Sequence, residues 1–254
     1  MKQSITTTIP LFAIASALSL LLAGTSQAAF TALPSPTPEF PGVSLGPVQA
    51  TGGGTVLATL DTAFVDNAMP TPFATGTLRS FVVDRGGGLL DFYYQLVNTT
   101  RQPDFTSEFF RMKTTGGFDP SLVLSVGQAD SLAGLVAGAG SGFVAGNYTT
   151  GASLQPAETA DRDVATLGSV GFDFPMQPPP AFIGDPMNIE AGETSTFLVV
   201  RTNSRSYGNV NMVIDGAGTS VATSFAAVPE PGSMIFGLAL LGALGVSRRR
   251  ERHA

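Results

Sequence analysis

A nine-residue run of alternating apolar and polar side chains, Leu89 to Val97, constrains the fold of this chain more than any other feature. The residues that share one face of an extended strand are Leu90, Phe92, Tyr94 and Leu96, and those on the other are Asp91, Tyr93 and Gln95. A period of two predicts a β-strand with one face in a core and the other facing outward. The Asp-Arg-Gly-Gly-Gly sequence of residues 84–88 predicts a hairpin turn just before it.

Similar short runs recur along the middle of the chain, separated by Gly, Asn, Asp and Pro turns. The further strands predicted are Thr55–Leu60, Leu78–Val83, Phe105–Lys113, Leu122–Val126, Ala165–Phe174, Thr194–Thr202, Val210–Ile214 and Thr219–Ala226. A parallel sheet would need crossover helices of a dozen or more residues, and no amphipathic helix pattern offers them. The sequence therefore predicts an all-β domain over residues 51–227, an antiparallel β-sandwich or jelly roll. Its strand order does not follow from the pattern.

The composition excludes several kinds of functional site that depend on Cys or His. The chain has 254 residues with no Cys, no Trp and a single His, His253, next to the last residue. Disulfides, thiolate nucleophiles and Cys-ligated metals are thereby excluded. A Ser–His–Asp triad inside a folded domain is also disfavoured, because the one His lies at the end of the tail. We expect no cofactor and no enzyme activity.

The charge is unevenly distributed. Residues 30–228 contain Lys113 and seven Arg against seventeen Asp and Glu, a net charge of −9. An acidic domain of this kind repels phosphate backbones, so nucleic acid is not an expected partner. Positive charge is concentrated at the two ends of the chain, next to its two most apolar runs. Basic residues beside an apolar run are typical of membrane targeting.

The N-terminus has the order of a secretory signal peptide. Lys2 precedes an apolar run from Ile9 to Ala23, and small residues then lead to Ala28. This order predicts a signal peptide over residues 1–28 that signal peptidase removes by cutting after Ala28. Residues 29–50 contain five prolines and predict an extended segment, either a semi-rigid spacer or an irregular edge of the fold.

The C-terminal tail, residues 228–254, has three parts in order. Pro229, Glu230 and Pro231 end any preceding strand and separate the tail from the folded domain. An apolar run over residues 233–247 follows, somewhat shorter than the roughly 20 residues of a full membrane span. The run ends at Arg248, Arg249 and Arg250, which predict a cytoplasmic anchor. We expect this run to form an apolar membrane helix.

Taken together, these three parts resemble the PEP-CTERM sorting signal of exported proteins. The resemblance covers residues 228–252, about a tenth of the chain. It implies that an exosortase, a membrane transpeptidase, recognises Pro229, Glu230 and Pro231, and that Arg248–Arg250 fix the topology. It also implies transient anchoring in the inner membrane and later transfer to the cell surface, commonly beside exopolysaccharide and biofilm. These residues are substrate positions for another enzyme.

Two segments of the middle region have the composition of a ligand site. Five glycines between Gly134 and Gly146 resemble a nucleotide loop, but no helix pattern follows them, so we expect a mobile loop that could cover another part of the protein. Glu158, Asp161 and Asp163 form the densest acidic cluster, which could offer oxygens to calcium. The cluster lacks the ordered spacing of a calcium loop, and a solvated loop is the favoured interpretation.

The functional expectation is a non-enzymatic exported protein at the cell surface or in the extracellular matrix, with exopolysaccharide as a possible partner. One alternative is a carbohydrate- or ice-binding module, for which Tyr93, Tyr148 and Tyr207 could offer amphipathic contacts. A secreted hydrolase that uses two carboxylates is less favoured, since acidic pairs at a suitable distance arise by chance among seventeen acidic residues. The sequence does not identify the ligand or the assembly state.

Overall fold

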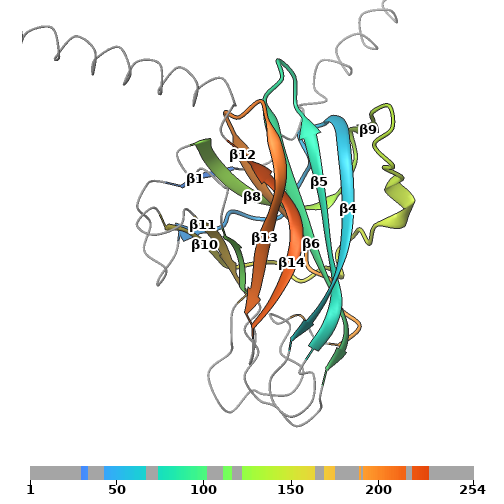
Figure 1. Ribbon diagram of the computed structural model, residues 1–254, viewed down its shortest axis with the longest axis vertical. Helices are drawn as coiled ribbons and strands as arrows, with labels where there is room; N and C mark the ends of the chain where they lie inside the picture. The colour runs from blue at the N-terminus through green and yellow to red at the C-terminus, as the bar shows by residue number, and fades with distance from the viewer. Residues whose placement is uncertain are drawn as a thin grey trace, which may run out of the picture.

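The computed structural model describes residues 30–33, 43–66, 74–101, 111–115, 122–163, 169–174, 189, 191–215 and 219–228. These residues form two β-sheets whose long strands run along the long axis of the molecule (Figure 1). The predicted signal peptide, the Pro-Glu-Pro sequence, the membrane helix and the Arg cluster all lie outside the described residues. Within the described part of the chain, no helix is long and apolar enough to cross a membrane.

The first sheet has eight strands in the order β1-β8-β12-β6-β5-β4-β9, with β3 also paired to β8. The strands are β1 (Thr31–Ala32), β3 (Gln49–Ala50), β4 (Gly54–Asp66), β5 (Ala74–Asp84), β6 (Leu90–Arg101), β8 (Val123–Ser131), β9 (Leu135–Ala137) and β12 (Phe197–Thr202). The pairs β3–β8 and β4–β9 are parallel, and the other pairs are antiparallel. The long strands β4, β5 and β6 form a continuous meander.

The second sheet has six strands in the order β14-β13-β7-β11-β10-β2, and all of its pairs are antiparallel. The strands are β2 (Val43–Ser44), β7 (Arg111–Thr115), β10 (Thr159–Asp163), β11 (Ser169–Asp173), β13 (Tyr207–Asp215) and β14 (Thr219–Ala227). β14 lies at one edge of this sheet and approaches β4 of the first, where Thr62 Oγ1 donates to the Thr223 carbonyl at 2.8 Å. The two sheets are therefore joined along this side.

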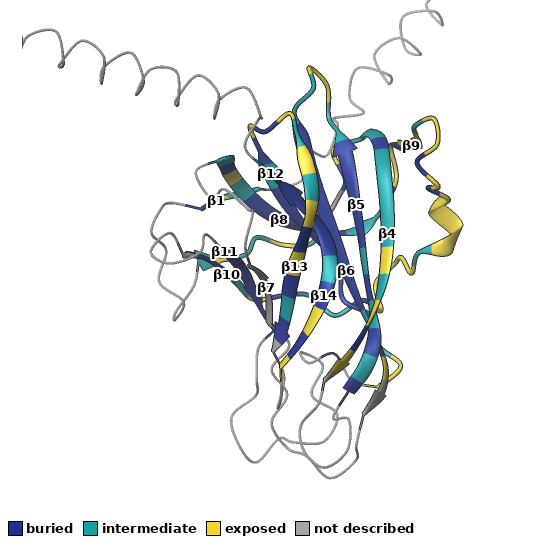
Figure 2. Ribbon diagram, in the orientation of Figure 1, coloured by how far each residue is buried: buried dark blue, intermediate teal, exposed yellow. Residues whose placement is uncertain are grey.

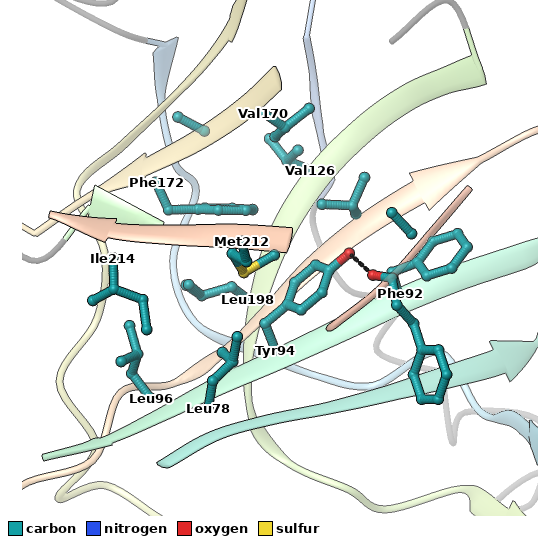
Figure 3. Close-up of a cluster of buried hydrophobic side chains, with 14 of the residues drawn as sticks. Leu78, Phe92, Tyr94, Leu96, Val126, Val170, Phe172, Leu198, Met212 and Ile214 are labelled. Atoms are coloured by element: carbon teal, nitrogen blue, oxygen red, sulfur yellow. Dashed lines mark hydrogen bonds between the residues drawn. The ribbon is translucent and has the colours of Figure 1, made fainter. Parts of the chain in front are cut away.

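The main core fills the space between the two sheets. The first sheet contributes Leu78, Phe92, Tyr94, Leu96, Val126 and Leu198, and the second contributes Val170, Phe172, Met212 and Ile214 (Figure 3). A hydrogen bond also crosses this apolar layer, from Tyr94 Oη to the Phe225 carbonyl at 2.8 Å. Burial of apolar area at about 25 cal/mol per Å² is the main force that holds such layers together. The predicted all-β sandwich is thus confirmed.

The predicted hairpin turn joins β5 to β6. The side chain of Asp84 accepts from the Gly86 amide at 2.7 Å, and the Arg85 amide donates to the Leu89 carbonyl at 3.1 Å. Three consecutive glycines, residues 86–88, have positive φ angles between 68° and 112°. Side chains other than glycine are strained in this region, which explains the Gly-Gly-Gly sequence.

A second, smaller core covers the outer face of the first sheet. Phe143, Leu154 and Leu135 come from the segment between β8 and β10, and they pack on Phe81 and Tyr93 of the sheet. We call residues 132–154 the cover segment. As a result β5 and β12 are buried over most of their length (Figure 2). The outward face expected for the Leu89–Val97 strand is therefore also buried over much of its length.

Candidate functional site

The last strand leads directly to the point where the predicted sorting tail begins. β14 ends at Ala227, and Val228 is held by the connection between β12 and β13. The Val228 amide donates to the Ser206 carbonyl at 3.3 Å, and Ser206 Oγ donates to the Val228 carbonyl at 2.8 Å. Ser204 Oγ lies 3.5 Å from the same carbonyl oxygen. The residue before Pro229 is thus fixed to the folded domain.

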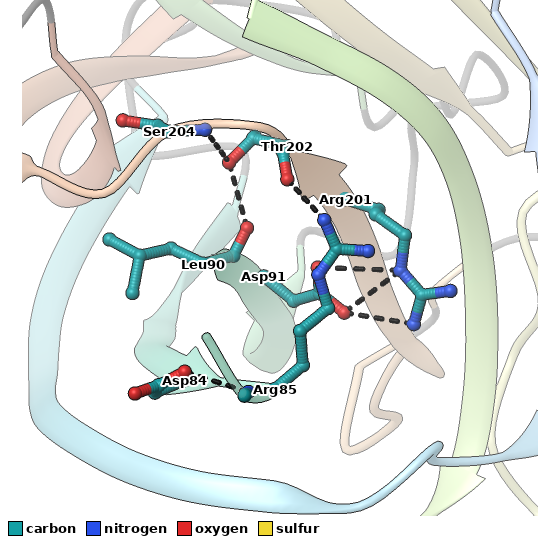
Figure 4. Close-up of polar contacts among 8 residues, drawn as sticks. Asp84, Arg85, Leu90, Asp91, Arg201, Thr202 and Ser204 are labelled. Carbon is teal, nitrogen blue, oxygen red and sulfur yellow. Dashed lines mark hydrogen bonds and ion pairs between the residues drawn. The ribbon is translucent and has the colours of Figure 1, made fainter. Parts of the chain in front are cut away.

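A buried ion cluster lies at the same end of the sandwich (Figure 4). Arg201 donates to Asp91 Oδ2 from Nη2 at 3.0 Å and from Nε at 3.1 Å, and Arg85 Nε lies 3.4 Å from Oδ1. The side chain of Asp91 is only 2% exposed. Burial raises the pKa of Asp91, and the hydrogen bond from Arg201 and the charges of both arginines offset part of this effect.

Hydrogen bonds link the ion cluster to the tail. Arg85 Nη2 donates to the Thr202 carbonyl, and Thr202 Oγ1 donates to the Leu90 carbonyl at 2.7 Å. Thr202 Oγ1 also accepts from the Ser204 amide at 3.2 Å. Because Ser204 contacts Val228 in turn, the ends of β5, β6, β12 and β14 form one connected network. We call this region the exit end, defined by Arg85, Asp91, Arg201, Thr202, Ser204, Ser206 and Val228.

The start of the described chain reaches the exit end as well. The Arg201 guanidinium carbon lies 3.6 Å from the centre of the Phe30 ring, a cation–π contact. The next two residues form β1 and pair with β8, Thr31 opposite Val126. Phe30 is the second residue after the predicted signal-peptide cut, so both predicted processing points adjoin the same end of the sandwich.

The comparisons with known proteins identify the tail. Residues 227–251 match the PEP-CTERM protein-sorting motif, so the match begins at the last residue of β14. No curated protein and no solved structure matches this chain. This motif implies export, anchoring at the C-terminus and sorting by an exosortase-type system. The chain therefore carries a PEP-CTERM sorting motif at its C-terminal end.

The structure corrects the prediction for the outer face of β6. Tyr93 is 1% exposed, and its ring stacks on Phe81 with ring centres 4.9 Å apart. Gln95 is fully buried, and its Nε2 donates to the carbonyls of Thr149 and Ser195 at 2.8 and 3.2 Å. Tyr93 therefore offers no surface to a ligand. Burial raises its pKa, as expected for a phenol in an apolar layer.

The glycine-rich stretch belongs to the cover segment and does not form a nucleotide loop. Leu135 and Phe143 point into the second core, and a Cβ on Gly138 would lie 2.5 Å from the Val56 carbonyl oxygen. Glycine is needed there because the backbone of the cover segment approaches the sheet so closely. The expectation that this stretch covers another part of the protein fits its packing.

The acidic cluster is a strand, and the expected solvated loop is wrong for its centre. Asp161 and Arg162 lie in β10 and are 1% and 7% exposed. Arg162 Nη1 donates to the carbonyls of Leu33 at 3.0 Å and Val123 at 3.2 Å. Glu158 is exposed before the strand. Among the described residues, no three His, Cys, Asp or Glu side chains gather in a way that could hold a metal ion.

The remaining two tyrosines lie at the surface. Tyr148 is half-buried, with Arg79 5.7 Å from its ring centre and Phe143 stacked at 5.5 Å. Burial raises the pKa of Tyr148 to about 12. Tyr207 is 37% exposed and packs edge-on against Phe225 of the neighbouring strand β14. These two rings are on different sheets and do not form one platform.

A shallow hollow of about 250 Å³ lies beside Gln128. Both ends of this buried amide are used by the protein itself. Its Nε2 donates to the carbonyls of Gly46 and Ala157, while its Oε1 accepts from the Ala157 amide and from Thr196 Oγ1. Gln128 therefore connects the walls of the hollow to each other.

Sequence reasoning missed the ion cluster. A weak signal was present, because Asp91 lies in the middle of the clearest strand and Arg201 interrupts the apolar run of β12. The pairing itself joins residues 110 positions apart. It follows from strand order, since β12 pairs with β6 and places Arg201 opposite Asp91.

Proposed function

We propose that the mature protein is a non-enzymatic component of the cell surface or extracellular matrix, associated with exopolysaccharide. In this proposal signal peptidase cuts after Ala28, the tail holds the protein in the inner membrane, and exosortase processes the chain near Pro229–Pro231. The observation that carries the proposal is the sorting motif that starts at the last residue of β14. The polar groups of Asp91, Gln95 and Arg162 support it, because they bind other parts of the same domain.

The sorting step is tested by truncation in the native host. Deletion of residues 229–254 should move the protein from the membrane and surface fractions to the soluble exported fraction, because the recognition sequence and the anchor are both lost. Deletion of residues 252–254 alone is the matched control, since these residues lie beyond the matched motif. If both truncated chains fractionate like the full chain, the tail is not the sorting signal.

Association with exopolysaccharide is tested by co-purification. The surface-delivered protein should bind native exopolysaccharide from its own host and should not bind dextran. Equal recovery with both polymers, or with neither, would contradict the proposed association without affecting the sorting step. The two parts of the proposal are therefore tested separately.

Direct carbohydrate binding is a second candidate, supported by the surface around Tyr148. Its half-exposed ring lies beside Arg79, and Arg79 Nε is 3.8 Å from Asp61 Oδ2. An aromatic ring beside charged hydrogen-bonding groups is a suitable surface for a sugar. We expect Tyr148→Ala to lose polysaccharide binding while the control Tyr207→Ala retains it. Asp61→Asn serves as a second variant that leaves the ring in place.

A further inference from the structure

The two described ends of the chain meet at one end of the sandwich. Phe30 contacts Arg201, and Val228 contacts Ser206. Residues 202–204 join these two contacts through the hydrogen bonds of Thr202 and Ser204. The sorting tail and the predicted signal peptide therefore leave the domain at the same end, so the domain can complete its fold while either one is still in the membrane.

The spacing to the membrane is short. Only residues 229–232 separate Val228 from the apolar run that begins at Ser233. An extended or polyproline chain covers roughly 3.1–3.4 Å per residue, so the five Cα–Cα steps from Val228 to Ser233 span about 16–17 Å. Two prolines restrict its flexibility further. When the tail is inserted, the exit end therefore lies within about 17 Å of the bilayer surface.

The charge of the exit end differs from that of the domain as a whole. With the neighbouring Asp84 and the exposed Arg205, the exit end contains three arginines and two acids, a net charge of +1. Residues 30–228 together carry −9, so the rest of the domain carries −10. The stem of Arg205 lies about 4 Å from where a Cβ on Gly88 would stand, which places it at the β5–β6 turn. An anionic bilayer attracts such an end and repels the remainder.

We propose that the exit end is a membrane-docking surface that contacts anionic phospholipid headgroups while the tail spans the membrane. This inference rests on the tail anchoring in the proposed function. Docking holds the Pro229–Pro231 sequence at headgroup depth, where an exosortase embedded in the membrane works. Arg205 is the principal contact, because Arg85 and Arg201 are already paired with Asp91.

The chain contains no cysteine, so one introduced cysteine gives a unique label. Asn203→Cys marks the exit end, where Asn203 is exposed, and Val65→Cys marks the other end of β4, where Val65 is 43% exposed. Thr55 lies at the end of β4 next to the β5–β6 turn, and Val65 lies ten residues further along. At about 3.3 Å per residue these two positions are roughly 33 Å apart, so the two labels mark opposite ends of the sandwich. The full chain is incorporated through its tail into phosphatidylcholine vesicles with or without phosphatidylglycerol. Energy transfer to a headgroup-labelled lipid is then measured.

We expect transfer from position 203 to exceed transfer from position 65, and to increase when phosphatidylglycerol is present. Arg205→Gln should lower the ratio of docked to undocked chains about fivefold in the anionic vesicles, since one arginine near the surface contributes about 1 kcal/mol. The matched control Arg79→Gln removes an arginine that is paired with Asp61 on the outer sheet face and should have no effect.

The same transfer with and without phosphatidylglycerol, or no effect of Arg205→Gln, would overturn the docking surface and leave the tail as a simple tether. Contact that occurs only after exosortase is added to the vesicles would also overturn it, in favour of a protein partner. A chain that does not float with vesicles of either composition would overturn the tail anchoring itself, and docking with it. The two failures are thus distinguishable.

Discussion

The two faces of β6 are both buried, but they are buried by different means. The inner face packs Phe92 and Tyr94 against the second sheet in an almost wholly apolar layer. The outer face places Asp91, Tyr93 and Gln95 under arginines and the cover segment. The comparison shows that a strand with alternating apolar and polar residues does not always have a solvent-exposed face. Here the inner face holds the two sheets together, and the outer face holds one segment and the exit end.

The largest predicted effect compares the two cores. Phe92→Ala should lower the free energy of unfolding by about 3–5 kcal/mol, because it leaves a cavity between the sheets. Phe143→Ala should cost only about 1–3 kcal/mol, because the cover segment can detach locally while the sandwich remains folded. Urea unfolding measures both losses. Hydrogen exchange should show loss of protection confined to the cover segment in Phe143→Ala, and equal losses in both variants would break the comparison.

The next effect concerns the buried ion cluster. Asp91→Ala should cost about 2–4 kcal/mol, because Arg201 and Arg85 lose their common partner at a site largely shielded from water. Asp61→Ala is the matched control, since its carboxylate is 57% exposed and 3.8 Å from Arg79. An exposed pair of this kind contributes at most about 1 kcal/mol. Comparable thermal shifts in the two variants would mean that the cluster is not a structural centre.

A smaller effect comes from the hydrogen bond of Tyr94 across the main core. Tyr94→Phe removes the donor to the Phe225 carbonyl and leaves a buried acceptor, so we expect a loss of about 1–2 kcal/mol. Tyr207→Phe alters an exposed residue and should change stability by less than about 0.5 kcal/mol. Denaturant midpoints distinguish the two. If Tyr94→Phe leaves the free energy of unfolding unchanged, water replaces the lost hydrogen bond and therefore reaches the main core.

The smallest predicted effect is a pH dependence. Burial raises the folded-state pKa of Asp91 above its ordinary value of 3.8, so the folded protein holds this proton more tightly than the unfolded chain does. Its stabilising contribution is therefore complete below pH 3.8 and is lost as the pH rises through the folded-state pKa. Relative to Asp91→Asn, the wild-type protein should lose unfolding free energy as the pH rises above about 3.8 and through the raised folded-state pKa of Asp91. The opposite slope would show that the arginines outweigh burial.

The sequence predicted the fold because long strands carry a clear periodic signal. Each of the nine predicted strands overlaps an observed one, and the run from Leu89 to Val97 falls almost wholly within β6. The two- and three-residue strands β1, β2, β3 and β9 were missed, since they are too short for a period. In β10 the sequence suggested a loop because Asp161 and Arg162 are charged. Their burial depends on partners such as Leu33, more than a hundred residues away.

The candidate site also has one part that the sequence predicted and one part that it did not. The sorting tail was readable because its three parts are contiguous in sequence. The exit end was not, because Asp91, Arg201 and Val228 come together only through the pairing of β6, β12, β13 and β14. Tyr93 was misplaced for a related reason, since no local pattern reveals that the cover segment lies over its face.

Intact-mass spectrometry of the protein recovered from the cell surface tests the central claim most directly. The account predicts a chain that begins at Ala29 and ends near Pro229–Pro231, because both membrane segments are removed at the exit end. The same measurement on a chain with Pro229, Glu230 and Pro231 all replaced by Ala should find no processed protein at the surface. Recovery of a surface chain that still carries residues 233–254 would contradict the account.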